Sequence, residues 1–300
     1  MKIYIQDHTS HAGKWIYNGF AHAWAYLEYE VKFINDLSEV KTNEEYKLFI
    51  CDSKINKNNL QIVKNSVKTY LYVQPNSFPK PWGDHPNFQC CLDDDLINEL
   101  NSLTNAVQWN FASFFEYHTK WKNVISVPLA FDDINYSYEI PSSFEYDICF
   151  VGGIADNGFN EKAMIMQETL NYFISNSGLK CAFAVGRNLS HEQENHALSK
   201  SKIALNIHDA YQRHVGSDTN ERTFKSLACT GILISDDIKQ AKDLFEFSFF
   251  SNDLQKSVEE AKRICSLNIN DLIQIKKHNQ KTILRKHTYI NRAQQLLSLK

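Results

Sequence analysis

Residues 206–224 hold the densest group of chemically useful side chains in the sequence. Its polar members include His208, Asp209, Arg213, His214, Asp218, Asn220, Glu221 and Arg222. The apolar residues that follow predict a short helix that stops at Gly231. The first amides of a helix have no partners within it and attract anions. The segment is therefore predicted to start a helix that binds a diphosphate; the alternative is an ordinary helix cap made by Thr219 or Asn220.

Two earlier loops also carry groups suited to binding anions. Gly152 and Gly153 follow an apolar run and permit close backbone approach at the start of a helix, although they could form a simple turn. Arg187 follows another apolar run and could bind phosphate through two hydrogen bonds, or lie on the surface. Lys162 lies early in a predicted helix, where a solvated lysine is the favoured interpretation over a phosphate ligand.

Residues 7–15 offer groups that could move a proton. Asp7 and His11 lie close together in the sequence directly after the first apolar run. Histidine titrates near neutral pH and a nearby carboxylate can orient it, so this pair suits a general base. The alternative is a polar loop in which Thr9 or Ser10 caps the next helix.

Short apolar runs alternate with helical patterns along the chain, which predicts α/β architecture. The runs that read as strands are residues 2–7, 31–36, 46–52, 68–74, 146–153, 180–186, 202–209 and 231–237. Helical spacing is clearest in residues 16–30, 160–178 and 269–300. This alternation predicts parallel sheets with helices on both faces, in two doubly wound, Rossmann-like domains.

Residues 127–147 interrupt the alternation with two prolines and several turn-forming residues, and are predicted to link the domains. The predicted boundaries are 1–135 for the first domain, 136–280 for the second, and 281–300 for a terminal helix that returns to the first. Parallel sheets bind ligands at the carboxyl ends of their strands. Two such domains facing one another would form a cleft lined by the loops described above.

Composition narrows the classes of function. The chain has 300 residues, 43% of them hydrophobic, and a formal net charge of −3, which argues against a general nucleic-acid binder. Its seven cysteines show neither metal-ligand nor redox spacing, so we expect a reducing, cytoplasmic compartment. We expect neither a signal peptide nor a membrane span, and leave contact with the inner face of the membrane open.

Three patterns mimic known sites without matching them. In residues 191–196 the second histidine comes one position too late for a zinc helix, so a solvated helix face is predicted. The aspartates at 93–95 are predicted to begin a helix, where its dipole favours acids. A Gly-x-Ser-x-Gly nucleophile motif is absent, and so is the glycine fingerprint of a Rossmann dehydrogenase.

Three segments together resemble the CgeB-like glycosyltransferases, within the group-1 glycosyltransferases of the GT-B fold. They are SKIALNIHD (residues 201–209), NERTFKSLACTGILISD (220–236) and RKHTYINRAQQLL (285–297). The resemblance covers roughly residues 127–297 and is only architectural over the first domain. Asn220 and Arg222 match the family's Asn and Arg. Lys225 stands where the family usually has a glutamate that meets the donor ribose, and Thr230 intrudes before Gly231.

The resemblance implies transfer of a hexosyl-type sugar from a nucleotide-sugar donor to an acceptor hydroxyl, in cell-surface glycan or polysaccharide synthesis. It implies no cofactor and no essential metal. The second domain would hold the donor, and the first a glycan, lipid-linked or protein acceptor; no nucleic acid is expected as a partner. The expected donor-binding residues are Gly152, Gly153, Arg187, His208, Asn220, Glu221, Arg222 and Lys225, and the expected catalytic bases are His11 and Asp7.

The departure at Lys225 leaves several interpretations open. Glu221 could take over the ribose contact, the donor could differ, or activity could be lost; Lys225 could also add positive charge near the phosphates. Two other classes therefore stay as alternatives. One is a nucleotide-sugar epimerase of the same architecture, and the other is a non-catalytic binding module of the GT-B type.

Overall fold

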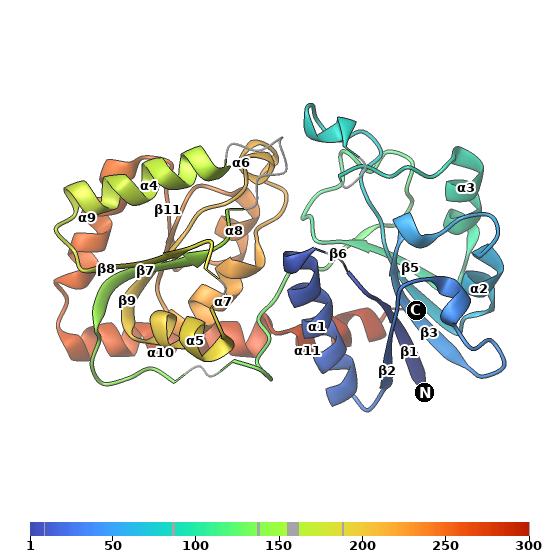
Figure 1. Ribbon diagram of the computed structural model, residues 1–300, viewed down its shortest axis with the longest axis horizontal. Coiled ribbons are helices and arrows are strands. Elements are labelled where there is room, and N and C mark those ends of the chain that lie inside the picture. The colour runs from blue at the N-terminus through green and yellow to red at the C-terminus, as the bar shows by residue number, and fades with distance from the viewer. Residues whose placement is uncertain (9, 86–87, 137–138, 155–161, 188, 300) are drawn as a thin grey trace. The chain divides into compact units, whose positions relative to one another are not determined.

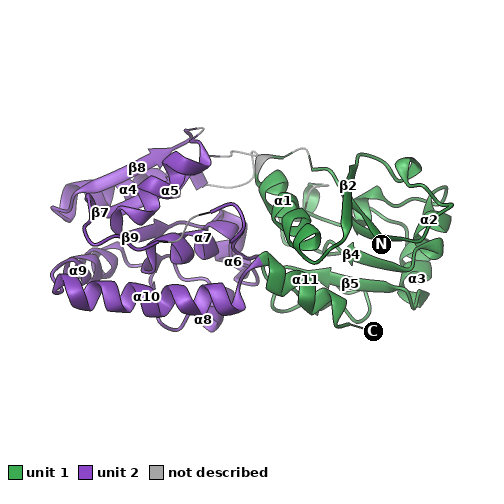
Figure 2. Cartoon of the chain, turned by 90° about the horizontal axis from the view of Figure 1, so that it is seen from below, with its two compact units in different colours: residues 1–128, 289–300 green, residues 129–288 purple. Residues whose placement is uncertain are grey.

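The chain divides into two compact units, coloured separately in Figure 2. The computed structural model describes residues 1–8, 10–85, 88–136, 139–154, 162–187 and 189–299. Unit 1 contains residues 1–128 and 289–300, and unit 2 contains residues 129–288. The boundaries expected at residues 135 and 280 stay predictions.

Unit 1 is built on a six-stranded parallel sheet of order β2-β1-β3-β4-β5-β6. Its strands are β1 (Lys2–Gln6), β2 (Glu30–Ile34), β3 (Tyr46–Cys51), β4 (Lys68–Tyr72), β5 (Ala106–Asn110) and β6 (Ile125–Ser126). Its helices are α1 (His11–Tyr26), α2 (Leu60–Asn65), α3 (Asp94–Ser102) and α11 (Tyr289–Leu297). Short 3-10 turns lie at Leu37–Glu39, Asp52–Lys54 and Trp82–Asp84.

Side chains alternate between the two faces of this sheet and bury both of them. On one face, strand residues such as Leu48 and Leu71 pack with α2 and α3. The other face has an aromatic core in which Phe20 of α1 contacts Phe49, Trp109 and Tyr289. Tyr289, the first residue of α11, is 1% exposed. The last helix of the chain therefore completes the core of unit 1.

The predicted helix over residues 269–300 is two helices, because α10 (Ile269–Lys286) ends before α11 begins. At the break, the amide of Phe131 donates to the carbonyl of His287 at 2.9 Å, and Phe131 forms a bridge with Thr288. This strand-like pairing draws the backbone out of the helical conformation. Periodicity predicted the helical conformation of these residues but not the break that divides them into two helices.

Unit 2 is built on a five-stranded parallel sheet of order β11-β10-β9-β7-β8. Its strands are β7 (Tyr146–Gly152), β8 (Cys181–Val185), β9 (Ser201–Asn206), β10 (Leu233–Ser235) and β11 (Phe249–Phe250). Its other helices are α4 (Lys162–Asn176), α5 (His191–Ser199), α6 (Ala210–Val215), α7 (Glu221–Thr230), α8 (Lys239–Leu244) and α9 (Leu254–Cys265). In Figure 1, α4 and α9 cover one face, while α5, α7 and α10 cover the other.

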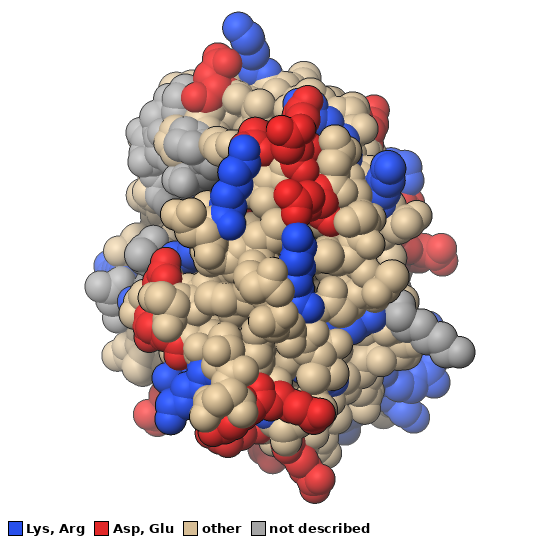
Figure 3. Space-filling model, turned by 90° about the vertical axis from the view of Figure 1, so that its right-hand side faces the viewer, with Lys and Arg blue, Asp and Glu red and all other residues tan. Residues whose placement is uncertain are grey.

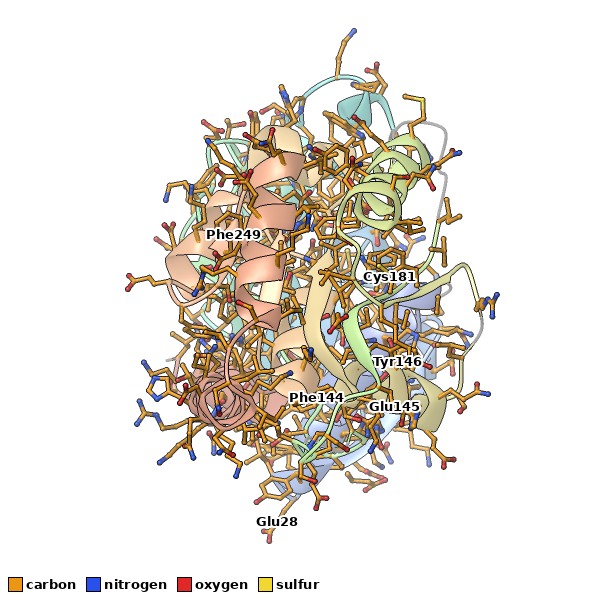
Figure 4. All side chains as sticks on the ribbon, turned by 90° about the vertical axis from the view of Figure 1, so that its left-hand side faces the viewer. Glu28, Phe144, Glu145, Tyr146, Cys181 and Phe249 are labelled. Carbon is orange, nitrogen blue, oxygen red and sulfur yellow. The ribbon has the colours of Figure 1, made fainter. Side chains whose placement is uncertain are left out.

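A buried lysine marks the amino-terminal edge of the unit 2 sheet. Figure 4 shows this edge, where Phe144, Glu145 and Tyr146 lead into β7. Lys276 of α10 is 0% exposed, and its ammonium donates to the carbonyls of Ser201 and Thr230. It lies 4.7 Å from the centre of the Phe144 ring. Burial lowers the pKa of Lys276 to about 7.

The start of α3 agrees with the expectation from the sequence. Asp93 caps α3, its side chain accepting from the amide of Leu96 at 2.8 Å, as predicted for an acidic helix start. On the face drawn in Figure 3, basic and acidic residues are interspersed and do not form one basic patch. Within the described residues, no helix combines the length and the apolar character needed to cross a bilayer.

Candidate functional site

The start of α7 lies beside the carboxyl ends of strands β7 and β9, where parallel sheets bind ligands. Asn220 caps the helix, its side-chain oxygen accepting from the amide of Thr223 at 3.1 Å. Gly231 ends it in the left-handed conformation, with φ of 80°. The predicted helix between a polar cap and a glycine stop is confirmed. The cap serves the amide of Thr223 and leaves the other early amides for a ligand.

Arg222 is the most suitable anion ligand of this helix. Its guanidinium lies 5.0 Å from the centre of the Phe150 ring of β7. One nitrogen, Nη1, donates to the carbonyl of Ile207 at 3.2 Å. In the described part of the chain, Arg222 forms no ion pair with a carboxylate. Burial lowers the pKa of Arg222, and the charge of Asp209 opposes this shift. A largely buried guanidinium held by a ring and a carbonyl retains donors for an anion.

Gly152, at the end of β7, makes room for this guanidinium. A Cβ atom at this position would lie 2.5 Å from Nη2 of Arg222, well inside contact distance. The neighbouring Gly153 has nothing within 4 Å of its corresponding position. The two glycines therefore have different surroundings, a difference that the sequence did not show. Gly152 permits the close approach that was predicted for the pair, but to an arginine of the same chain.

We expect Gly152→Ala to weaken nucleoside-diphosphate binding about tenfold, because the methyl group must displace the Arg222 guanidinium. The global stability should change by less than about 1 kcal/mol, since the clashing atoms end a flexible side chain. Calorimetric titration and urea unfolding would measure the two effects. Gly153→Ala is the matched control and should bind as the wild type does; equal affinity for both variants would contradict the prediction.

Lys162 belongs to the same cluster, and the interpretation of it as a solvated lysine is wrong. This first residue of α4 is 8% exposed, and its ammonium lies 2.6 Å from Oδ1 of Asp209. Burial and the nearby charge of Arg222 lower the pKa of Lys162, while Asp209 opposes the shift. Two cations, Lys162 and Arg222, thus lie close to one carboxylate at the carboxyl end of the sheet.

His208 is buried beside the loop that precedes α7, and its role in donor binding stays a prediction. It is 0% exposed. Its Nδ1 lies 2.6 Å from Oδ1 of Asp236, and its Nε2 lies 2.7 Å from the hydroxyl of Thr219. Burial opposes ionisation of Asp236, but the charge and hydrogen bonds of His208 outweigh it, so the pKa of Asp236 is lowered. His208 therefore fixes the loop that precedes α7.

Lys225 is buried, and two carboxylates balance its positive charge. It is 8% exposed, and its ammonium lies 2.7 Å from Oε1 of Glu194 and 3.8 Å from Oε2 of Glu221. Burial disfavours its charge, but Glu221 and Glu194 outweigh that effect and raise the pKa of Lys225. Tyr136 donates to Oε2 of Glu194 at 2.9 Å. The charge of Lys225 is thus paired within the protein, and its role in donor binding stays a prediction.

Residues 191–196 form the start of α5, and the prediction of a solvated face is wrong at Glu194, which is 7% exposed. Three more predicted residues lie near the carboxyl ends of other strands. Arg187 is exposed after β8. In unit 1, Asp7 is exposed after β1, and its carboxylate accepts from the amide of His8 at 2.9 Å. His11 is the first residue of α1, and its side chain lies outside what the structure describes.

Acidic and cysteine side chains do not gather into a metal site in the described ranges. No group of three or more histidine, cysteine, aspartate or glutamate residues there has the arrangement to hold a metal ion. The cysteines in these ranges are all free thiols. The cluster at α7 offers two cations and the start of a helix, which are groups that bind phosphate-bearing ligands.

Known proteins share the sequence pattern of unit 2 and the fold of the whole chain. Residues 168–298 match the model of a family described as glycosyl transferase-like. No match was found among curated proteins. Among solved structures, T4 phage BGT in complex with UDP and Mn2+ is 11% identical with a TM-score of 0.55, over 99% of this chain and 98% of that one.

Two bacterial structures are also similar. The α,α-trehalose 6-phosphate synthase of Burkholderia multivorans is 9% identical with a TM-score of 0.52, over 88% of this chain and 71% of that one. TarM of S. aureus, solved with UDP, is 9% identical with a TM-score of 0.53, over 93% and 58% respectively. The chain therefore has the two-domain GT-B fold of these glycosyltransferases, and most of its second unit matches the glycosyl transferase-like family.

Proposed function

We propose that this protein is a glycosyltransferase that moves a sugar from a nucleoside-diphosphate sugar to an acceptor hydroxyl. The main observation behind the proposal is the position of the Arg222 guanidinium at the start of α7. The guanidinium lies against the Phe150 ring and close to Gly152. The match of residues 168–298 to a glycosyl transferase-like family supports it. So do the complexes of structural relatives with UDP, although their low identity extends only the fold to this chain.

The proposed chemistry follows from the leaving group. Cleaving the bond between sugar and diphosphate leaves negative charge on a phosphate oxygen, which must be stabilised in the transition state. Arg222 and Lys162 supply positive charge, and the early amides of α7 supply oriented donors. We propose that these groups suffice without a divalent ion. Transfer that persists in excess EDTA is the expected result, and its loss would contradict metal independence.

An acceptor hydroxyl becomes a better nucleophile when a base removes its proton. We propose Asp7 or His11 of unit 1 for this step. His11→Ala should retain donor binding and lose transfer, because the base touches only the acceptor. Donor binding is measured by calorimetry and transfer by release of nucleoside diphosphate. Full transfer activity in the variant would remove His11 from the mechanism, and the same comparison with Asp7→Asn tests the other candidate.

The finer assignments rest on the sequence resemblance. We propose a CgeB-like enzyme with a hexosyl donor, a glycan, lipid-linked or protein acceptor, and a cytoplasmic role in cell-surface glycan or polysaccharide synthesis. A thermal-shift screen against common nucleotide sugars identifies the donor, because a ligand that binds only the folded state raises its melting temperature. The stabilising donor is then incubated with candidate acceptors. Donor isomerisation without an acceptor would indicate an epimerase, and binding without any turnover a non-catalytic module.

A further inference from the structure

Asp209 occupies an unexpected place in a cluster built to hold phosphate. It lies just beyond β9, at the amino-terminal cap of α6, and its side chain is 28% exposed. Oδ1 lies 2.6 Å from the ammonium of Lys162. Asp209 also acts on Arg222 more strongly than the other nearby carboxylates do, favouring the charged guanidinium. One carboxylate thus neutralises part of the positive charge that a diphosphate would use.

We propose that Asp209 is an internal competitor of the diphosphate: its carboxylate holds Lys162 in the empty site and limits how tightly the diphosphate is retained. The inference rests on the proposed function and deepens it. Two negative groups that share the same cations repel one another, and partial burial strengthens this repulsion compared with that in water. A site without Asp209 would hold the nucleoside diphosphate product more tightly and release it more slowly.

The neighbouring groups argue against a purely structural ion pair. Asp209 also caps α6, a role that needs an oxygen acceptor and no charge. Asparagine would keep that cap. The side chains of Lys162 and Asp209 are 10% and 28% exposed, and Oδ1 of Asp209, the oxygen beside Lys162, is itself buried. An anion that binds Lys162 has to displace this oxygen, as one charge-assisted contact exchanges for another.

The test is calorimetric titration of inorganic pyrophosphate and of UDP into the full-length wild type and Asp209→Asn. Both probes should bind the variant about tenfold more tightly, because a negative charge near both cations is removed and Lys162 loses its counterion. In turnover, KM for the donor and kcat should both fall, since product release slows. Unchanged or weaker binding of both probes to Asp209→Asn would overturn the proposal, and weaker binding would make the carboxylate a ligand or a structural support.

Three further variants make the result specific. Asp147→Asn is the matched control, because Asp147 pairs with Lys202 at 2.7 Å near the start of the same strands and should not affect affinity. Lys162→Met in the Asp209→Asn background should cancel the gain. Arg222→Ala distinguishes failure of the proposed site from failure of the role of Asp209. If Arg222→Ala leaves pyrophosphate affinity unchanged, the proposed site is wrong. If Arg222→Ala loses pyrophosphate binding but Asp209→Asn shows no gain, only the role of Asp209 is rejected.

Discussion

Arg222→Ala is expected to bind nucleoside diphosphates about 2–4 kcal/mol more weakly than the wild type, or roughly 30- to 1,000-fold. The guanidinium is fixed between Phe150 and the carbonyl of Ile207 before any ligand arrives, so little side-chain entropy is lost on binding. Removing it takes away charge-assisted hydrogen bonds that no neighbouring side chain can replace. Calorimetry with UDP and other nucleoside diphosphates measures the loss.

Arg263→Ala is the matched control for this experiment. Arg263 is an exposed arginine of α9 in the same unit, so its removal changes the net charge equally and leaves the cluster at α7 intact. We expect its affinity to stay within about threefold of the wild type, as for a screened surface charge. Equal losses of affinity in the two variants would mean that long-range charge, and not the position of Arg222, determines binding. Circular dichroism confirms that both variants are folded.

Lys276→Met is expected to change how stability depends on pH. Lys276 has its pKa lowered to about 7 in the folded protein, whereas an unfolded lysine titrates near 10.5. Between these values the unfolded chain binds the proton and the folded chain does not, so the contribution of Lys276 to stability rises with pH. It is lowest below pH 7 and fully gained only above 10.5. The stability of the wild type relative to Lys276→Met should rise by about 2 kcal/mol between pH 7 and pH 9.

Urea unfolding at several pH values between 6 and 9 measures this difference. The comparison with the variant removes the effects of other titrating groups, including buried tyrosines and cysteines whose raised pKa values act in the opposite direction. Lys277→Met is the control, because it is the next residue of the same helix and is exposed. A difference between wild type and Lys276→Met that stays flat over this range would show that Lys276 is protonated in the folded state throughout.

The sequence predicted the architecture because each element could be recognised locally. The runs that became β1, β3, β7 and β9 are short, apolar and followed by polar loops, which is typical of buried parallel strands. The start and stop of α7 were equally visible, because Asn220 and Gly231 act on the backbone within a few residues of themselves. Features that depend on neighbours in sequence are the ones that sequence analysis predicts well.

The partners of the charged residues could not be predicted, because they come from distant parts of the chain. Lys162 and Asp209 are separated by two strands and a helix, and Glu194 meets Lys225 only because α5 packs against α7. One signal was available: Glu194 lies four residues before the buried Leu198, on the same side of α5. A carboxylate on the apolar side of a helix indicates a buried cation elsewhere, but does not identify it.

The place of Tyr289 in the aromatic core of unit 1 has a consequence for how the chain is made. Its ring packs against Phe20 of α1, and a Cβ atom on Gly19 would lie 2.4 Å from it. During synthesis, residues 1–128 leave the ribosome long before this tyrosine does. Until Tyr289 is made, the apolar surface of unit 1 that it covers stays exposed. Unit 2, an uninterrupted segment, has all its residues before the first unit is complete. A carboxyl-terminal deletion that includes Tyr289 would leave that face permanently unfilled and favour aggregation.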